Sequence, residues 1–107
     1  MAAVNMNYEM FEKEVIQAGK PALVDFWAPW CVYCRRINAA YEQIAKENPD
    51  VLVAKVNIDE YPALAEQYGV EVIPTLMVFR DSEERDRVVA PGSKAQIQAF
   101  LKQNLEV

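Results

Sequence analysis

Residues 22–28, Ala-Leu-Val-Asp-Phe-Trp-Ala, are apolar apart from one aspartate, Asp25. A run of this length without polar alternation is typical of a β-strand that is buried on both faces of its sheet. Such a strand cannot face solvent on either side. The fold must therefore place other elements above and below it.

Helical and strand-like periodicities alternate along the rest of the chain. Apolar residues at helical spacing, ended by stop signals such as Gly19 and Gly69, predict helices, and β-branched runs predict strands. A charged segment, 81–86, joins the last two strands, and a hairpin is the simplest connection. Ser93 and Gln96 form a capping-box pattern that opens the final helix. The predicted elements are helix 8–18, strand 22–28, helix 37–45, strand 51–58, helix 63–68, strands 75–79 and 87–89, and a helix from 93 onward.

This order predicts a single α/β domain over residues 1–107. Strands separated by helices are joined by right-handed crossovers and run parallel, whereas the late hairpin adds antiparallel strands. A chain of 107 residues has no room for a second core of useful size. The predicted architecture is therefore one mixed sheet with helices on both faces.

Charge and composition exclude several functions. The 11 Lys and Arg residues against 16 Asp and Glu residues give a net charge of −5, whereas nucleic acid and anionic membranes require a basic surface. The chain has no histidine, so hydrolases built on Ser-His-Asp or Cys-His are excluded. We therefore expect neither nucleic acid nor a membrane among the partners.

The first nine residues have no basic region followed by an apolar run, so they do not resemble a signal peptide. The most apolar stretch, 21–34, is shorter than the roughly 20 residues of a membrane span and is interrupted by Asp25 and Pro29. These features favour the cytoplasm, where thiols are kept reduced and static disulfides are rare. The two cysteines are then expected to do redox work or to bind metal.

Those cysteines, Cys31 and Cys34, follow the predicted buried strand and lie where a helix starts. The first sulfur there lies beside unpaired backbone N–H groups and the positive end of the helix dipole. Both favour the thiolate, and such motifs lower a cysteine pKa from about 8.5 to roughly 3.5–7.5. Cys34, one helical turn later, can close a short disulfide or resolve a mixed one. Cys-x-x-Cys in this context indicates redox chemistry.

Two other interpretations of the pair remain open at this point. Cys-x-x-Cys is half of a zinc site, but four ligands are needed and the chain has no other Cys and no His. Zinc or an iron–sulfur cluster would require a dimer that shares two ligands from each chain. A pair of inert buried thiols is the second alternative. We favour redox use, without a metal.

Further segments resemble the thioredoxin family, and the similarity extends over almost the full length of the chain. They are Val-Asp-Phe-Trp-Ala-Pro-Trp-Cys at 24–31, Lys-Val-Asn-Ile-Asp at 55–59, Tyr-Gly-Val at 68–70, Ile-Pro-Thr-Leu at 73–76, and Gly92. The resemblance implies the thioredoxin fold, a central mixed β-sheet flanked by helices on both faces. It also implies an enzyme that reduces disulfides in other proteins.

A role for each site residue follows from this resemblance. Cys31, exposed at the helix start, would attack a substrate disulfide, and Cys34 would then attack Cys31, leaving a Cys31–Cys34 disulfide. Asp25 would be buried with a raised pKa and would exchange a proton with Cys34. Lys55 on the neighbouring strand is the usual charge partner of this aspartate in the family. A solvated Asp25 with a surface Lys55 is the alternative.

The peptide bond between Ile73 and Pro74 is cis in the family and lies against the cysteine pair, where the residue before the proline pairs with the substrate backbone. Trp30, Ile73, Pro74 and Gly92 would form a shallow apolar patch around Cys31. A flat patch with backbone contacts suits many substrates and selects little among their sequences.

The sequence departs from the family between the cysteines, where Val32 and Tyr33 replace the usual Gly-Pro. Loss of that proline should favour the reduced form. We therefore expect a reduction potential less negative than the thioredoxin value of about −270 mV, nearer the glutaredoxin range of about −200 to −230 mV. Tyr33 is also similar to the residue that precedes the second cysteine in glutaredoxins, although the other segments favour thioredoxins.

The leading hypothesis is a general dithiol–disulfide oxidoreductase that acts on disulfide-containing client proteins, in electron transport and cell redox homeostasis. With 3 glycines and no Gly-x-Gly-x-x-Gly, the chain is expected to bind no cofactor. Electrons must then come from a separate thioredoxin reductase, linked to NADPH or to ferredoxin. We expect a monomer. The alternatives are a thioredoxin-like clamp that binds partners without turnover, a less reducing glutaredoxin-like enzyme, and an oxidase or isomerase.

Overall fold

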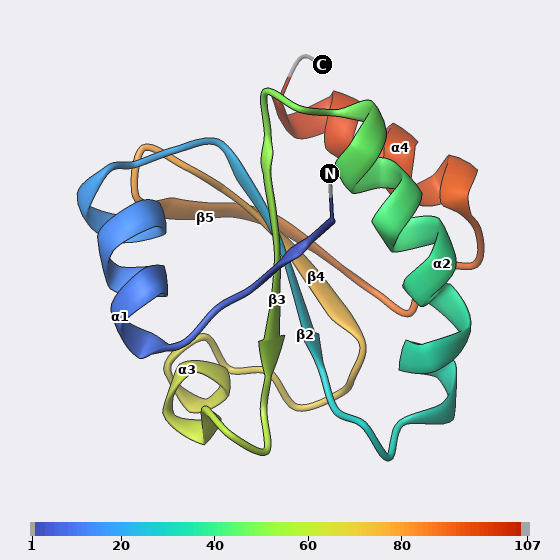
Figure 1. Ribbon diagram of the computed structural model, residues 1–107, viewed down its shortest axis with the longest axis horizontal. Helices are drawn as coiled ribbons and strands as arrows, with labels where there is room; N and C mark the ends of the chain where they lie inside the picture. The colour runs from blue at the N-terminus through green and yellow to red at the C-terminus, as the bar shows by residue number, and fades with distance from the viewer. Residues whose placement is uncertain (1, 106–107) are drawn as a thin grey trace.

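The computed structural model describes residues 2–105 as a mixed five-stranded sheet with helices on both faces (Figure 1). This arrangement confirms the predicted α/β class. A π-helical segment, Glu12–Gln17, directly continues the first helix, Tyr8–Phe11. In chain order the elements are β1 (Val4–Asn5), α1 (Tyr8–Phe11), η1 (Glu12–Gln17), β2 (Ala22–Trp27), α2 (Val32–Glu47), β3 (Leu52–Asn57), α3 (Pro62–Gln67), β4 (Thr75–Arg80), β5 (Glu83–Val89) and α4 (Lys94–Leu105).

The strand predicted to be buried, β2, lies in the centre of the sheet order β1-β3-β2-β4-β5. It pairs in parallel with β3 and antiparallel with β4. Because β4 runs opposite to β2, the start of β4 lies beside the end of β2, where the chain turns into α2. The cysteine pair and the Ile73–Pro74 segment are therefore brought to the same edge of the sheet.

The two faces of the sheet are covered by different helices. Figure 1 shows α2 and α4 on one side of the strands and α1 and α3 on the other. Successive residues of a strand point to opposite faces, and Leu23 packs in the cluster under α2 and α4, whereas Val24 and Phe26 pack under α1 and α3. Asp25 shares the face of Leu23. The carboxyl group of Asp25 therefore points toward α2.

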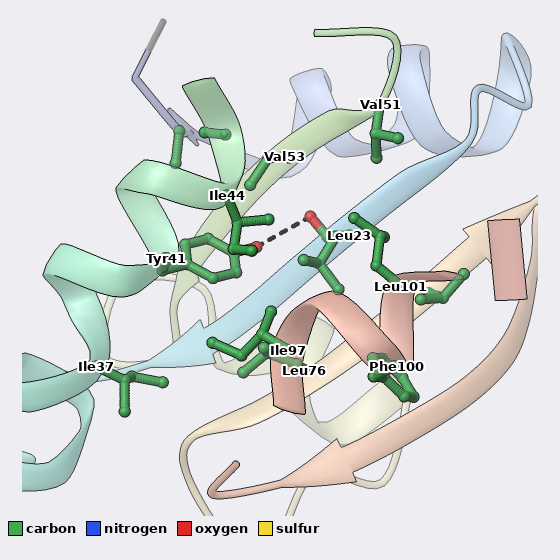
Figure 2. Close-up of a cluster of buried hydrophobic side chains, with 13 residues drawn as sticks. Leu23, Ile37, Tyr41, Ile44, Val51, Val53, Leu76, Ile97, Phe100 and Leu101 are labelled. Carbon is green, nitrogen blue, oxygen red and sulfur yellow. Dashed lines mark hydrogen bonds between the residues drawn. The ribbon is translucent and has the colours of Figure 1, made fainter. Parts of the chain in front are cut away.

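Tyr41 fastens α2 to the sheet. Its side chain is fully buried in the cluster of Figure 2. Its hydroxyl lies 2.6 Å from the carbonyl oxygen of Ala54 and 3.1 Å from that of Leu23, so it can donate to either strand. Leaving a buried hydroxyl unpaired would cost about 1–3 kcal/mol. This contact fixes the position of α2 above β2 and β3 about two turns after Cys34.

The two edges of the sheet differ from the sequence-based prediction. The two-residue strand β1 was not predicted, because it is too short to carry a periodic pattern. β5 begins at Glu83 rather than at 87, because charged side chains on both faces of an edge strand hide its alternation. The turn before it consists of Asp81 and Ser82, whose φ angles of 54° and 72° are those of a two-residue hairpin turn. The Ser82 hydroxyl also donates to the carbonyl of Ile16.

The predicted capping of α4 is half confirmed. The N–H of Gln96 donates to Ser93 Oγ at 3.2 Å, as the capping box requires. The Gln96 side chain accepts from the N–H of Gly92 rather than from that of Ser93. This bond ties the loop that contains Gly92 to the start of α4.

Candidate functional site

The two cysteines occupy the first turn of the longest helix. Cys31 is the N-cap residue of α2, and Cys34 follows within the first turn. They are joined by a disulfide, with Cα atoms 5.2 Å apart. The N–H of Cys34 points at Cys31 Sγ, at 3.1 Å. In the reduced protein this N–H and the positive end of the helix dipole would stabilise a thiolate on Cys31.

Neither cysteine is exposed. Cys31 is 8% exposed and Cys34 is 3% exposed, so the expectation of an exposed Cys31 was wrong in degree, although Cys31 is the more open of the two. The carbonyl oxygen of Ile73 lies 3.9 Å from Cys31 Sγ and covers part of it.

The Ile73–Pro74 peptide bond is cis, as the resemblance implied. It immediately precedes β4. The carbonyl of Pro74 accepts from the N–H of Ala90 at 2.9 Å, while the carbonyl of Ile73 lies against Cys31. The start of α2, the cis peptide bond and the loop after β5 therefore meet at one place.

The apolar surface around Cys31 is formed partly by other residues than those predicted for the patch. Trp30 is 65% exposed, and its indole N–H donates to Asp59 Oδ1 at 3.1 Å. Ile73 is half-buried and Pro74 is buried, so Pro74 adds no exposed side-chain surface. Two valines that were not predicted as part of this patch, Val32 and Val72, are 54% and 57% exposed. The exposed apolar groups near the disulfide are thus Trp30, Val32 and Val72.

Tyr33 links the active-site helix to the loop after β5. Its hydroxyl donates to the carbonyl oxygen of Pro91 at 2.8 Å, across 58 residues of sequence, and its ring packs against the core cluster under α2 and α4. Tyr33, one of the two residues that replace Gly-Pro, therefore connects the loop that contains Gly92 to the start of α2 through a hydrogen bond.

The backbone strain in this loop lies at Ala90 and not at Gly92. Ala90 has φ 48°, a left-handed conformation that disfavours any residue with a Cβ. Gly92 is exposed and lies outside that region. The backbone conformation therefore does not require glycine at position 92, whereas glycine at position 90 would relieve the left-handed conformation.

Replacing Ala90 by glycine should stabilise the protein by up to about 1 kcal/mol. The left-handed conformation costs an L-residue about 1–2 kcal/mol, and the larger entropy of glycine in the unfolded chain offsets roughly 0.5–1 kcal/mol of that relief. Urea unfolding measures the change. The matched control is Ala99→Gly at an exposed position within α4, which should destabilise by about 1 kcal/mol. If Ala90→Gly lost as much stability as the control, the backbone at Ala90 would not be strained.

Asp25 is buried beneath the disulfide. Its side chain is 1% exposed and Oδ1 has no hydrogen-bond partner. Burial raises the pKa of Asp25 to about 7, and the charge of Lys55 acts in the opposite direction. Beside it lies a pocket of about 190 Å³ lined by Asp25, Trp27, Cys34, Arg35, Asn38 and Lys55. The carboxyl group and the inner sulfur therefore share one small polar space, and the solvated alternative for Asp25 is wrong.

Lys55 stands opposite Asp25 in the register of β2 and β3, but the two form no ion pair. The Lys55 ammonium donates instead to Asn38 Oδ1 at 2.7 Å and lies 4.6 Å from the centre of the Trp27 ring. Lys55 thus acts on the carboxyl group through space. Asn38 was not predicted as part of the site, although its i,i+4 spacing from Cys34 places both on one face of α2.

Residues 2–105 contain no group of three Cys, His, Asp or Glu side chains arranged to hold a metal ion. Within the same part of the chain, no helix has the length and apolarity to cross a membrane.

The chain is similar to known thioredoxins over most of its length. The thioredoxin family model matches residues 2–103. Thioredoxin 1 of Synechococcus elongatus is 45% identical over 96 residues, which cover 89% of this chain and 90% of the relative. Thioredoxin 1 of Nostoc sp. is 40% identical over 97% of this chain and 98% of its own length. The thioredoxin of Acidithiobacillus ferridurans is 44% identical, with 97% of each chain covered.

Proposed function

Because the chain belongs to the thioredoxin family and is a protein thiol–disulfide oxidoreductase, we propose that Cys31 is its nucleophile and Cys34 its resolving cysteine. The Cys31 thiolate attacks one sulfur of a substrate disulfide, that S–S bond breaks, and the departing sulfur takes up a proton. Cys34 then attacks Cys31 Sγ and releases the second substrate sulfur as a thiol. The substrate gains two electrons and two protons, and the Cys31–Cys34 disulfide forms.

The hydrogen bond from the Cys34 N–H to Cys31 Sγ is the observation that carries this assignment. It directs the positive end of α2 at Cys31 and not at Cys34, so Cys31 is the sulfur whose thiolate is favoured. Its greater exposure also makes it the one that a substrate can reach first.

Asp25 is the proposed proton acceptor for Cys34. A carboxyl group with a pKa of about 7 is close to evenly divided between its two forms near neutral pH, which is where a general base and acid works best. The shared pocket supports transfer between Asp25 and Cys34. Lys55 would adjust the charge of this pair from the neighbouring strand.

Substrates are proposed to bind across Trp30, Ile73, Pro74 and Gly92, with the backbone of Ile73 beside the attacked disulfide. The contact between the Ile73 carbonyl and Cys31 Sγ supports this placement. The exposed apolar side chains of Trp30, Val32 and Val72 favour extended segments of many sequences over one specific ligand.

The wider cellular role is also part of the proposal. We assign residues 1–107 to one monomeric domain that works in the cytoplasm, in electron transport and redox homeostasis. A separate reductase, linked to NADPH or to ferredoxin, would return the disulfide to the dithiol. Val32 and Tyr33 in place of Gly-Pro favour a potential less negative than about −270 mV.

Reduction of insulin by dithiothreitol tests the function. The protein should accelerate insulin reduction well above the rate with dithiothreitol alone, because the dithiol is regenerated in each cycle. Binding of a disulfide-containing client without any acceleration would instead support the clamp.

A further inference from the structure

Asn38 binds the cation whose charge acts on the buried Asp25 carboxyl group. Its Oδ1 accepts from the Lys55 ammonium at 2.7 Å, and the face of Trp27 lies 4.6 Å from the same nitrogen. Trp27, Asn38 and Lys55 line the same pocket as Asp25, yet Asp25 Oδ1 has no hydrogen-bond partner. The ammonium is therefore fixed by a neutral acceptor and an aromatic ring instead of by a carboxylate.

Among the groups around Asp25, Lys55 is the charged residue that lowers its pKa. From α2, the residues Cys34, Arg35 and Asn38 line the shared pocket, and the charge of Asp25 acts on the buried Tyr41 hydroxyl. From β4, the residue paired with Asp25 is the uncharged Leu76. From β3, the residue paired with it is Lys55.

We propose that Asn38 is a positioning residue that keeps the Lys55 ammonium from forming an ion pair with the Asp25 carboxyl group and thereby sets the pH at which Asp25 exchanges its proton. The inference rests on the proposed proton transfer between Cys34 and Asp25. Without the Asn38 acceptor, the flexible Lys55 side chain is free to turn toward the unpartnered Oδ1 and form an ion pair with it. An ion pair favours the carboxylate, so the proton would be released at a lower pH.

Removing the acceptor should lower the titration midpoint of Asp25. In oxidised Asn38→Ala, the carboxyl-carbon NMR signal of Asp25 should titrate roughly half a pH unit or more below that of the wild type, as expected for a unit charge that moves a few ångström closer. Asn38→Asp should shift the midpoint upward, because the new carboxylate neutralises Lys55 and adds a like charge. Asn38→Leu, which keeps the volume of the side chain, should behave as Asn38→Ala does.

Two controls show whether the effect passes through Lys55. Gln43→Ala alters an exposed side chain on the same helix and should leave the midpoint unchanged. In a Lys55→Gln background, Asn38→Ala should have no further effect on the midpoint, because no ammonium remains to be moved.

An unchanged midpoint in both Asn38→Ala and Asn38→Leu, or a shift that persists without Lys55, would overturn the proposal. The pH profile of insulin reduction separates this outcome from failure of the proposed function. If the NMR midpoint moves as expected and the rate profile does not follow it, Asn38 positions Lys55 but Asp25 is not the proton acceptor.

Discussion

A Cys34→Ser variant is expected to trap disulfide-containing clients as stable covalent complexes, whereas Cys31→Ser should lose turnover by roughly a thousandfold or more. The Cys31 sulfur accepts a hydrogen bond from the N–H of Cys34, which stabilises its thiolate. Cys31 is therefore expected to make the first bond to the substrate. Without Cys34, nothing within the protein attacks that bond. Non-reducing electrophoresis of each variant with a model disulfide protein measures the trapping.

The two variants serve as matched controls for each other, because each removes one sulfur from the same helical turn. Complexes formed by Cys34→Ser should disappear when dithiothreitol is added. Trapping by Cys31→Ser but not by Cys34→Ser would reverse the assigned roles. Full activity in either variant would rule out the two-step exchange.

Asp25→Asn is expected to gain stability relative to the wild type as the pH rises from about 4 to about 8. The folded protein keeps the Asp25 proton up to about pH 7, whereas the unfolded chain loses it near the ordinary value of 3.8. Between these values ionisation favours only the unfolded state, so the wild type loses stability with rising pH. At 1.36 kcal/mol per unit, the loss approaches about 4 kcal/mol above pH 7.

Asparagine does not ionise, so the variant escapes this loss. Its buried amide still lacks a partner, which costs about 1–3 kcal/mol at every pH. The informative quantity is therefore the change with pH in the stability difference between the two oxidised proteins, measured by thermal or guanidinium unfolding. A difference that stays constant from about pH 4 to about pH 8 would show that the pKa of Asp25 is not raised.

The same substitution separates stability from catalysis. If Asp25 accepts the proton of Cys34, Asp25→Asn should slow insulin reduction most near neutral pH, where the wild-type carboxyl group changes form. A pH–rate profile with the same shape as that of the wild type would remove Asp25 from the reaction while leaving the stability prediction intact.

Elements with a strong local pattern were predictable from the sequence. The continuous apolar run gave β2, and the spacing of Ile37, Tyr41 and Ile44 gave α2, because burial on one face or on both faces leaves a mark on residue order. β1 leaves no such mark, since its two residues are ordered by pairing with β3. The start of β5 was hidden because both faces of that strand carry charges.

Those parts of the candidate site that lie in local sequence motifs were predictable, whereas contacts between residues far apart in the sequence were not. Cys31, Cys34 and Asp25 follow from the strand–helix junction, and the cis peptide bond at Pro74 followed only from the family resemblance. The bond between Tyr33 and the Pro91 carbonyl joins residues 58 positions apart, so no local pattern reports it. The family resemblance draws attention to Gly92, whereas the left-handed backbone conformation lies at Ala90.

The start of α2 is expected to favour the ionised form of the Cys31 sulfur, and the rate of its alkylation as a function of pH measures this ionisation. The reduced Cys34→Ser variant isolates that sulfur, and its reaction with iodoacetamide follows the thiolate fraction. The midpoint of the alkylation rate is expected clearly below the value of about 8.5 for free cysteine. A midpoint at or above that value would contradict this expectation.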